Sequence, residues 1–476
     1  MTLLPVGAIT NRSERYGAGA AWTSVPECPR SEAFANLRCL GQSPELDFGG
    51  SRPLGATKYD HSMKAEQIPI PPERNLLKGK FDGATGSGLI ASMTIRAFIT
   101  GLAGTTISSA ERSFLRQASP WGLILFERNI KNRGQVKALV DDFYDTLGYE
   151  AAVLIDQEGG RVQRLGPPHW RAYPTGAQYG WLYDRDPVLG LAAAKLGARL
   201  IAGDLSALGI TVNCLPVADV PVPGSDPVIG DRAYGNTPDK VAQIAGAIAD
   251  GLLEGGVLPV LKHLPGHGRA SCDSHFDLPV VAAPREVLEP TDFEAFRRLA
   301  HLPIGMTAHV MFTAIDPERP STQSPVIINE IIRGAIGFDG LLMSDDVSMG
   351  ALSGRIADRT SKALAAGCDI VLHCNGNMKE MEEVAAASCE IAGDALARSE
   401  RALAARRGAD AMDLNEARIT FSRMMGQNLI QLMPQPYNFF SLDFNIRGLS
   451  LYSAHGLMNH DSGIGQGIPF AVGARA

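Results

Sequence analysis

Short apolar runs alternate with longer amphipathic segments along most of the chain. The apolar runs lie near residues 97–102, 122–126, 151–156, 210–217, 257–263, 304–309, 340–345 and 369–374. Their length is typical of strands buried on both faces, and the segments between them have helical periodicity. Repeated strand–helix units predict a parallel sheet, and eight strands is the number that closes a TIM (β/α)8 barrel. We therefore predict an α/β barrel over roughly residues 95–400. An open doubly wound sheet is the alternative, because a sequence does not reveal closure.

Local signals at helix ends agree with this pattern. Thr237 is expected to cap a helix with Pro238 in its first turn, and that helix is expected to end at Gly255. The segment Thr291–Glu294 has the spacing of a capping box. Gly209 is expected to end the helix that precedes the strand at 210–217.

The two ends of the chain lack this order. Residues 1–92 are rich in Gly, Pro, Ser and Arg without periodicity, which indicates a flexible or irregular N-terminal extension, or a start-site artefact. The organised pattern begins near Met93, so we place the barrel domain at 93–410. Residues 411–476 are expected to form a C-terminal helix and an irregular tail.

Composition narrows the class of protein. A hydrophobic content of 45% and a charged content of 20% are ordinary for a soluble globular enzyme. The formal charge of -7 argues against nucleic acid or an anionic membrane surface as a partner. The sequence contains no unbroken run of about 18 apolar residues, so we expect no membrane-spanning segment. The apolar run at 3–9 has no basic residue before it and is too weak for a signal peptide.

The chain has seven cysteines. An odd number without a C-x-x-C pair is typical of free thiols, and we expect a cytoplasmic protein without disulfides. These cysteines are Cys28, Cys39, Cys214, Cys272, Cys368, Cys374 and Cys389.

The loop that follows the run at 257–261 carries the densest candidate chemistry. Lys262 and His263 end that run, where α/β folds place their chemistry. Pro265 and the neighbouring glycines disfavour a helix, so His263 and His267 are not expected to form a helical zinc pair. Further on, Asp273 and His275 are two residues apart, which allows the carboxylate to orient the imidazole as a general acid. The alternative is that each histidine only satisfies hydrogen bonds of the loop.

Two further segments follow predicted strands. In the first, Gly159 and Gly160 allow a tight turn that returns Arg164 towards Asp156. The side chains of Asp156 and Arg164 could bind sugar hydroxyls, or they could form an ion pair that only stabilises the turn. In the second, Arg232 is a candidate ligand clamp. Its alternative role is a surface ion pair with Asp231 or Asp239. Asp219 is expected to be structural.

Two adjacent carboxylates, Asp345 and Asp346, end another apolar run. Neighbours on a strand face opposite sides, so only one is expected to point into the barrel mouth while the other pairs locally. A carboxylate near Lys262 and arginines would stay ionised, as a nucleophile requires. No Walker A or Rossmann glycine pattern occurs in this part of the chain, which argues against nucleotide chemistry.

Five motifs, in order, carry a resemblance to a known family. They are Asp156-x-Glu158-Gly159-Gly160-Arg161-Val162-Gln163-Arg164, Gly230-Asp231-Arg232-x-Tyr234-Gly235, Lys262-His263-x-Pro265-Gly266-His267-Gly268, Asp273-Ser274-His275 and Ser344-Asp345-Asp346-x-Ser348-Met349. The chain resembles the bacterial β-N-acetylglucosaminidases (β-hexosaminidases) of glycoside hydrolase family 3 over approximately residues 93–410.

The resemblance implies a retaining β-N-acetylhexosaminidase, without cofactor or metal, that removes terminal N-acetylglucosamine from small glycans. These are muropeptide fragments in peptidoglycan recycling, or chitooligosaccharides. It implies that Asp345 is the nucleophile, that His275 is the acid/base and that Asp273 orients His275. It further implies that the sugar is bound by Asp156, Arg164, Arg232, Lys262 and His263. It assigns nothing to either extension and leaves the oligomeric state open.

The chemistry agrees with this assignment, because a retaining glycosidase needs one ionised carboxylate and one proton donor. A histidine donor is neutral after giving up its proton. Phosphate could therefore compete with water as the acceptor, which we state as a hypothesis. The chain departs from the family pattern at Leu264, where an aromatic residue is frequent.

Three alternatives remain at this stage. The first is a metal-dependent barrel hydrolase with ligands from His263, His267, His275 and Asp345. The second is a sugar-binding barrel without turnover. The third is a β-glucosidase of the same family, although those enzymes commonly take their acid from a large second domain.

Overall fold

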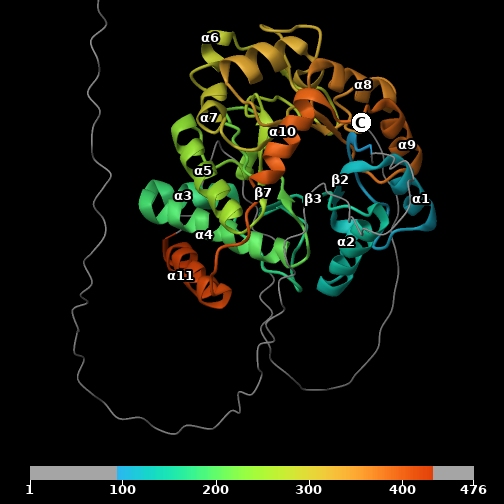
Figure 1. Ribbon diagram of the computed structural model, residues 1–476. Coiled ribbons are helices and arrows are strands. Elements are labelled where there is room, and N and C mark those ends of the chain that lie inside the picture. Colours follow the sequence, from blue (N-terminus) through green and yellow to red (C-terminus); the bar gives the residue numbers. More distant parts are fainter. Residues whose placement is uncertain (1–93, 433–476) are drawn as a thin grey trace, which may run out of the picture. The chain divides into compact units, whose positions relative to one another are not determined.

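Eight parallel strands form a closed barrel in the computed structural model, which describes residues 94–432 (Figure 1). Around the barrel the strand order is β1-β12-β11-β9-β7-β6-β3-β2. Their bounds are β1 Arg96–Thr100, β2 Pro120–Leu125, β3 Ala152–Ile155, β6 Val212–Asn213, β7 Leu258–Leu264, β9 Ile304–Thr307, β11 Leu341–Asp346 and β12 Ile370–Leu372. Each lies within or overlaps one of the eight predicted runs. The TIM barrel is therefore confirmed, and the open sheet is wrong.

Helices surround the barrel (Figure 1). They are α1 Ser109–Ala118, α2 Arg133–Leu147, α3 Gly176–Arg185, α4 Pro187–Ser206, α5 Pro238–Glu254, α6 Arg285–Leu288, α7 Asp292–Arg298, η4 Ile327–Ala335, α8 Ile356–Ala366, α9 Met378–Ala387, α10 Gly393–Ala404 and α11 Leu414–Leu432. Within residues 94–432, no helix is both long and apolar enough to cross a membrane. The extension expected over 1–92 and the tail beyond 432 lie outside the described residues.

Short elements occupy the loops between these strands and helices. The strands β4 (Gln157–Gly159) and β5 (Val162–Gln163) form an antiparallel hairpin, and β8 (Val280–Val281) pairs with β10 (Met311–Phe312). Single helical turns lie at η1 (Glu127–Asn129), η2 (Gly230–Arg232) and η3 (Ser321–Gln323).

Strand alternation divides the barrel residues between two apolar clusters. Ala97 and Ile99 belong to one cluster and Phe98 to the other, and β3 alternates in the same way. The first cluster fills the barrel interior, and the second joins the outer strand faces to the surrounding helices.

Helix α10 closes the N-terminal end of the barrel. The Trp121 indole N–H, at the start of β2, donates to Ser399 Oγ on α10 at 2.7 Å. Arg398 and Arg401 on α10 bind Asp339, which precedes β11. A functional site is therefore expected at the opposite end of the barrel, where the strands have their C-terminal ends.

Two predicted helix boundaries agree with the structure, but neither Thr237 nor Thr291 caps its helix through its side chain. Helix α5 begins at Pro238 after Thr237 and ends before Gly255, and Gly209 adopts a φ of 81° between α4 and β6. The capping box at Thr291 does not form, because its hydroxyl donates to the carbonyl of Val287 in the preceding helix. The Glu294 carboxylate binds Arg297 and Arg298 instead.

Helix α3 packs tightly on the chain segment that contains η2. A Cβ atom placed on Gly176 would lie 2.0 Å from the carbonyl oxygen of Arg232, and one on Gly180 would lie 1.9 Å from that of Tyr234. Real Cβ atoms do not approach so closely, so both glycines are required for this contact. The helix thereby sets the position of Arg232.

We expect Gly180→Ala to lower the free energy of unfolding by roughly 1–3 kcal/mol, the usual effect of overpacking. The added methyl group meets backbone rather than a flexible side chain. Urea unfolding provides the measurement. The control is Gly134→Ala in α2, where the nearest atom lies 3.7 Å away. That change should be neutral or stabilise by about 0.5–1 kcal/mol. Equal effects of the two substitutions would contradict the packing argument.

Candidate active site

Polar side chains gather where β3, β7 and β11 end. Asp156 follows β3, Lys262 and His263 lie near the end of β7, and Asp345 lies near the end of β11. Because all barrel strands are parallel, these residues share the C-terminal mouth.

Five charged side chains from three segments form a continuous chain of contacts at this mouth. Arg164 donates to Asp156 at 3.0 Å, and Lys262 Nζ contacts Asp156 at 3.1 Å and Glu158 at 2.8 Å. Arg232 donates through two nitrogens to the Glu158 carboxylate at 2.9 and 2.8 Å. We call this set the charged chain. Its three cations and two carboxylates leave one net positive charge.

The β4–β5 hairpin returns Arg164 to Asp156. Gly159 and Gly160 have φ values of 106° and 57° at the turn, conformations that glycine adopts without strain. The buried Gln157 side-chain oxygen accepts hydrogen bonds from the backbone N–H groups of Arg164 and Leu165. The structure thus brings Arg164 and Asp156 together as the sequence predicted.

Arg232 does not make either of the surface ion pairs that were considered for it. Its partner is Glu158, while Asp231 binds Arg161 and Asp239 binds Arg298. Only 10% of the Arg232 side chain is exposed. The surface-pair interpretation is wrong because tertiary packing against α3 turns this arginine inward.

Opposite charges within the charged chain stabilise one another. Burial alone would raise the pKa of Glu158, but the positive charges of Arg232 and Lys262 outweigh burial and bring it to about 2. Burial likewise opposes ionisation of Asp156, yet Lys262 and Arg164 hold its pKa well below the usual range. Burial acts to lower the pKa of Lys262, but Glu158 and Asp156 raise it overall. All three groups are therefore ionised at neutral pH.

Asp219 orients the histidines of β7 and of the loop after it. Its carboxylate accepts from His263 Nδ1 at 2.7 Å and from the backbone N–H of His267 at 2.6 Å. The Nδ1–H tautomer leaves His263 Nε2 facing Arg232 Nη2 at 3.5 Å. Asp219 is fully buried, and its predicted structural role takes this specific form.

The two carboxylates at the end of β11 have different surroundings. Asp346 accepts from the backbone N–H and hydroxyl of Ser348 and from the backbone N–H of Cys374. Asp345 is partly buried, lies on the same face of β11 as the interior residues Leu341 and Met343, and is close enough to His309, His263 and Lys262 for their charges to act on it. Burial acts to raise the pKa of Asp345, but these neighbours and the N–H of Asp346 lower it overall. Because alternate residues of a strand point to opposite sides, Asp346 binds neighbouring backbone and side-chain groups while Asp345 points into the barrel mouth.

The loop after β7 carries the second candidate pair. His275 Nδ1 lies 2.6 Å from Asp273 Oδ1, which assigns the proton to Nδ1 and leaves Nε2 available. The His275 side chain is 60% exposed, and the adjacent Phe276 is 76% exposed. The imidazole is thus oriented, but in this structure it faces solvent.

This loop is anchored on the segment that follows β11. The backbone N–H groups of Gly350 and Ala351 donate to the carbonyls of His275 and Ser274 at 3.0 and 3.2 Å. His267 Nε2 also bonds the hydroxyl of Ser274 at 2.9 Å. The Asp273–His275 pair and Asp345 consequently lie at the same end of the barrel.

Sequence reasoning gave no role to two neighbours of the site. Glu158 lies two positions after Asp156, and that spacing was the available signal. His309 follows β9, where it donates from Nε2 to the carbonyl of Asp346 at 3.0 Å and accepts from Thr322 at Nδ1. Its position at the end of a predicted strand was a weaker signal of the same kind.

The histidines at the mouth have separate partners. His263 is bound to Asp219, His267 to Ser274 and His275 to Asp273. Within the described part of the chain, no three His, Cys, Asp or Glu side chains are grouped as metal ligands.

The five cysteines in this part are unpaired.

Comparison with known proteins identifies relatives over the barrel. The Glycosyl hydrolase family 3 N terminal domain matches residues 90–402. A beta-hexosaminidase of Alkalilimnicola ehrlichii is 40% identical over 287 residues, which are 60% of this chain and 82% of that protein. A beta-hexosaminidase of Bordetella avium is 36% identical over 278 residues, 58% and 79% of the two chains.

Solved structures agree with these relatives. The crystal structure of NagZ from Neisseria gonorrhoeae in complex with N-trifluoroacetyl-D-glucosamine has a TM-score of 0.64 and 30% identity. The similarity covers 70% of this chain and 98% of that one. A family 3 beta-N-acetylglucosaminidase from Paenibacillus has a TM-score of 0.63 and 28% identity over 69% and 66% of the two chains.

We expect Glu158→Gln to destabilise the protein by about 3 kcal/mol at pH 7, because it leaves the buried Arg232 without its charged partner and removes one of the two carboxylates that contact Lys262. The pKa of Glu158 is about 2 in the fold against an ordinary 4.5, so its stabilisation is complete above pH 4.5. That stabilisation is lost as the pH falls towards 2. The difference between wild type and variant, measured by urea unfolding, should therefore be largest at pH 7 and shrink below pH 4.5.

The control for this measurement is Glu382→Gln, a change of an exposed glutamate on α9. It should alter stability little at any pH. A loss in Glu158→Gln that does not depend on pH would contradict the ionic origin of the stabilisation.

Proposed function

Because the chain belongs to glycosyl hydrolase family 3, we propose that this glycoside hydrolase is a retaining β-N-acetylhexosaminidase. It removes a terminal, non-reducing N-acetylglucosamine from β-linked glycans. The observation that carries the proposal is the inward, ionised Asp345 at the same barrel mouth as the oriented Asp273–His275 pair. A retaining glycosidase needs one nucleophilic carboxylate and one group that transfers a proton.

In the first step, an Asp345 oxygen attacks the anomeric carbon and the bond to the leaving oxygen breaks. His275, protonated on both nitrogens, gives its Nε2 proton to that oxygen, so the alcohol departs neutral. In the second step, neutral His275 takes a proton from water, whose oxygen attacks the anomeric carbon and releases Asp345. Asp273 keeps the Nδ1 proton in place and stabilises the charged imidazole in both steps.

The two steps require His275 to approach the sugar. Asp345 is partly buried, whereas His275 is exposed on a loop held by Ser274, Gly350 and Ala351. We propose that the loop moves inward with substrate bound and carries the Asp273–His275 pair as a unit. Motions of this kind complete the catalytic arrangement in many enzymes.

The charged chain is the proposed binding surface for the sugar. Carboxylates of Asp156 and Glu158 accept hydrogen bonds from hydroxyl groups, while Arg164, Lys262 and Arg232 donate to sugar oxygens. His263 adds an Nε2 acceptor whose orientation Asp219 fixes. Since these groups already hold one another, they need little reorganisation when the substrate arrives.

The choice of N-acetylglucosamine is supported by the relatives. NagZ of Neisseria gonorrhoeae binds N-trifluoroacetyl-D-glucosamine, an N-acylated glucosamine. Muropeptide fragments, chitooligosaccharides, a place in peptidoglycan recycling and a cytoplasmic location remain predictions from the sequence. The hypothesis that phosphate replaces water also remains; formation of a sugar phosphate at high phosphate concentration would support it.

We expect Asp345→Ala to lower kcat/KM on 4-nitrophenyl N-acetyl-β-D-glucosaminide by at least roughly a thousandfold, or about 4 kcal/mol of transition-state stabilisation. The loss arises because no other carboxylate can form the glycosyl–enzyme. The matched control is Asp358→Ala, an exposed aspartate on α8, which should retain wild-type kinetics. If Asp345→Ala has a wild-type melting temperature and still turns over the substrate, Asp345 is not the nucleophile. If the wild-type protein binds N-acetylglucosamine but shows no turnover, the alternative of a sugar-binding barrel without catalysis is favoured.

We expect His275→Ala to affect substrates according to their leaving group. With a 2,4-dinitrophenyl aglycone, kcat/KM should stay within about tenfold of wild type, because this phenolate departs without protonation. With a sugar as the leaving group, kcat/KM should fall by roughly 10²–10⁴. The comparison uses kcat/KM because this constant reports the glycosylation step. Equal losses on the two substrates would contradict the role of His275 as an acid.

A further inference from the structure

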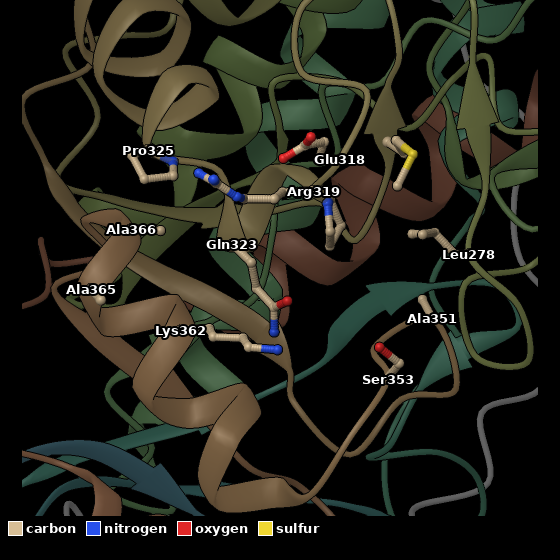
Figure 2. Close-up of a pocket in the computed structure, with 12 residues that line it drawn as sticks. Leu278, Glu318, Arg319, Gln323, Pro325, Ala351, Ser353, Lys362, Ala365 and Ala366 are labelled. Atoms are coloured by element: carbon tan, nitrogen blue, oxygen red, sulfur yellow. The ribbon is translucent and has the colours of Figure 1, made fainter.

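A pocket lies beside the loop that carries His275. It has a volume of about 470 Å³, within the range of small-molecule sites. Its walls come from the segment between β10 and η4, from α8, and from the segment after β11 (Figure 2). None of the residues that we assign to the glycosidase reaction lines it. It is therefore a separate candidate site.

The pocket lining combines two exposed cations with one shielded amide. Among residues 94–432, the side chains of Arg319 and Lys362 line the pocket, are exposed to solvent and make no hydrogen bond or ion pair with the protein. The Gln323 amide nitrogen is shielded from solvent and also has no acceptor. Figure 2 shows the ends of Gln323 and Lys362 directed into the same part of the pocket.

The charge of the lining favours an anion. Arg319 and Lys362 contribute two positive charges and Glu318 one negative charge, which leaves one net positive charge. This balance contrasts with the whole chain, whose formal charge is -7. A shielded donor that lacks an acceptor is energetically unfavourable, and an acceptor on a ligand would relieve this cost.

We propose that this pocket binds a small molecule that carries a carboxylate or phosphate group. Its anionic oxygens accept hydrogen bonds from Lys362 and from the Gln323 amide, and Arg319 provides a further cation on the pocket wall. This inference goes beyond the proposed glycosidase function and does not depend on it.

The pocket wall is shared with the anchor of the His275 loop. Ala351 lines the pocket, and its backbone N–H holds the carbonyl of Ser274. Leu278 lines it as well and lies three residues after His275. A ligand that packs against both residues stabilises the anchored arrangement of the loop. Binding should therefore slow hydrogen exchange of the Gly350 and Ala351 amides, which donate to the loop.

The test is calorimetric titration of the full chain with inorganic phosphate and, separately, with citrate, at constant ionic strength. We expect at least one anion to bind. The double variant Arg319→Gln/Lys362→Gln should weaken that binding by about tenfold or more, as loss of charge-assisted hydrogen bonds implies. A response to phosphate alone identifies a phosphoryl ligand, and a response to citrate alone identifies a carboxylate ligand.

The matched control is Lys379→Gln/Arg407→Gln, which removes two exposed cations outside the pocket lining. It should bind like wild type, which shows that a loss of affinity in the pocket variant does not come from the lower net charge alone. Binding at the active site would be unchanged in the pocket variant. Unchanged affinity in the pocket variant at a wild-type melting temperature would overturn the proposal, as would no binding of either anion. Slower exchange at Gly350 and Ala351 in wild type, but not in the pocket variant, would support the link to the loop.

Discussion

Lys262 lies between two carboxylates at the end of β7, with 3% of its side chain exposed. A buried ammonium group is tolerated only when opposite charges and hydrogen bonds surround it. Asp156 and Glu158 meet this need, and each is in turn held by an arginine, Asp156 by Arg164 after the β4–β5 hairpin and Glu158 by Arg232 of η2. The end of β3, the β4–β5 hairpin, η2 and β7 must therefore assemble in one arrangement. The geometry of the barrel mouth follows from this constraint.

The site combines a preorganised part with an exposed part. The charged chain, Asp219 and Asp345 lie on strand ends or on segments packed against them, so their positions are fixed before a substrate binds. The Asp273–His275 pair lies on a loop that only a few hydrogen bonds attach to the barrel. This division suits a reaction in which one group holds the sugar while another reaches different leaving groups. The proposed movement of this loop would also leave the mouth open for substrate entry.

Patterns that depend on neighbours in the sequence predicted much of this structure. Short apolar runs between helical segments identified the barrel strands, period-two alternation separated Asp345 from Asp346, and two glycines predicted the return of Arg164 to Asp156. Contacts between distant segments could not be predicted in this way. Glu158 and Arg232 meet only because α3 packs on η2, and Asp219 reaches His263 from the segment after the neighbouring strand β6. The predicted cap at Thr291 is wrong for a local reason, because its hydroxyl donates to the carbonyl of Val287, four residues earlier.

The central claim is that Asp345 forms a covalent bond with the sugar. It is tested most directly by incubating the full chain with a fluorinated N-acetylglucosaminide that carries a good leaving group, followed by peptide mapping. Fluorine slows both steps, and a good leaving group restores the first, so the glycosyl–enzyme accumulates. The account predicts a single labelled peptide, modified at Asp345. A label on another carboxylate, or turnover with inversion and no adduct, would contradict it.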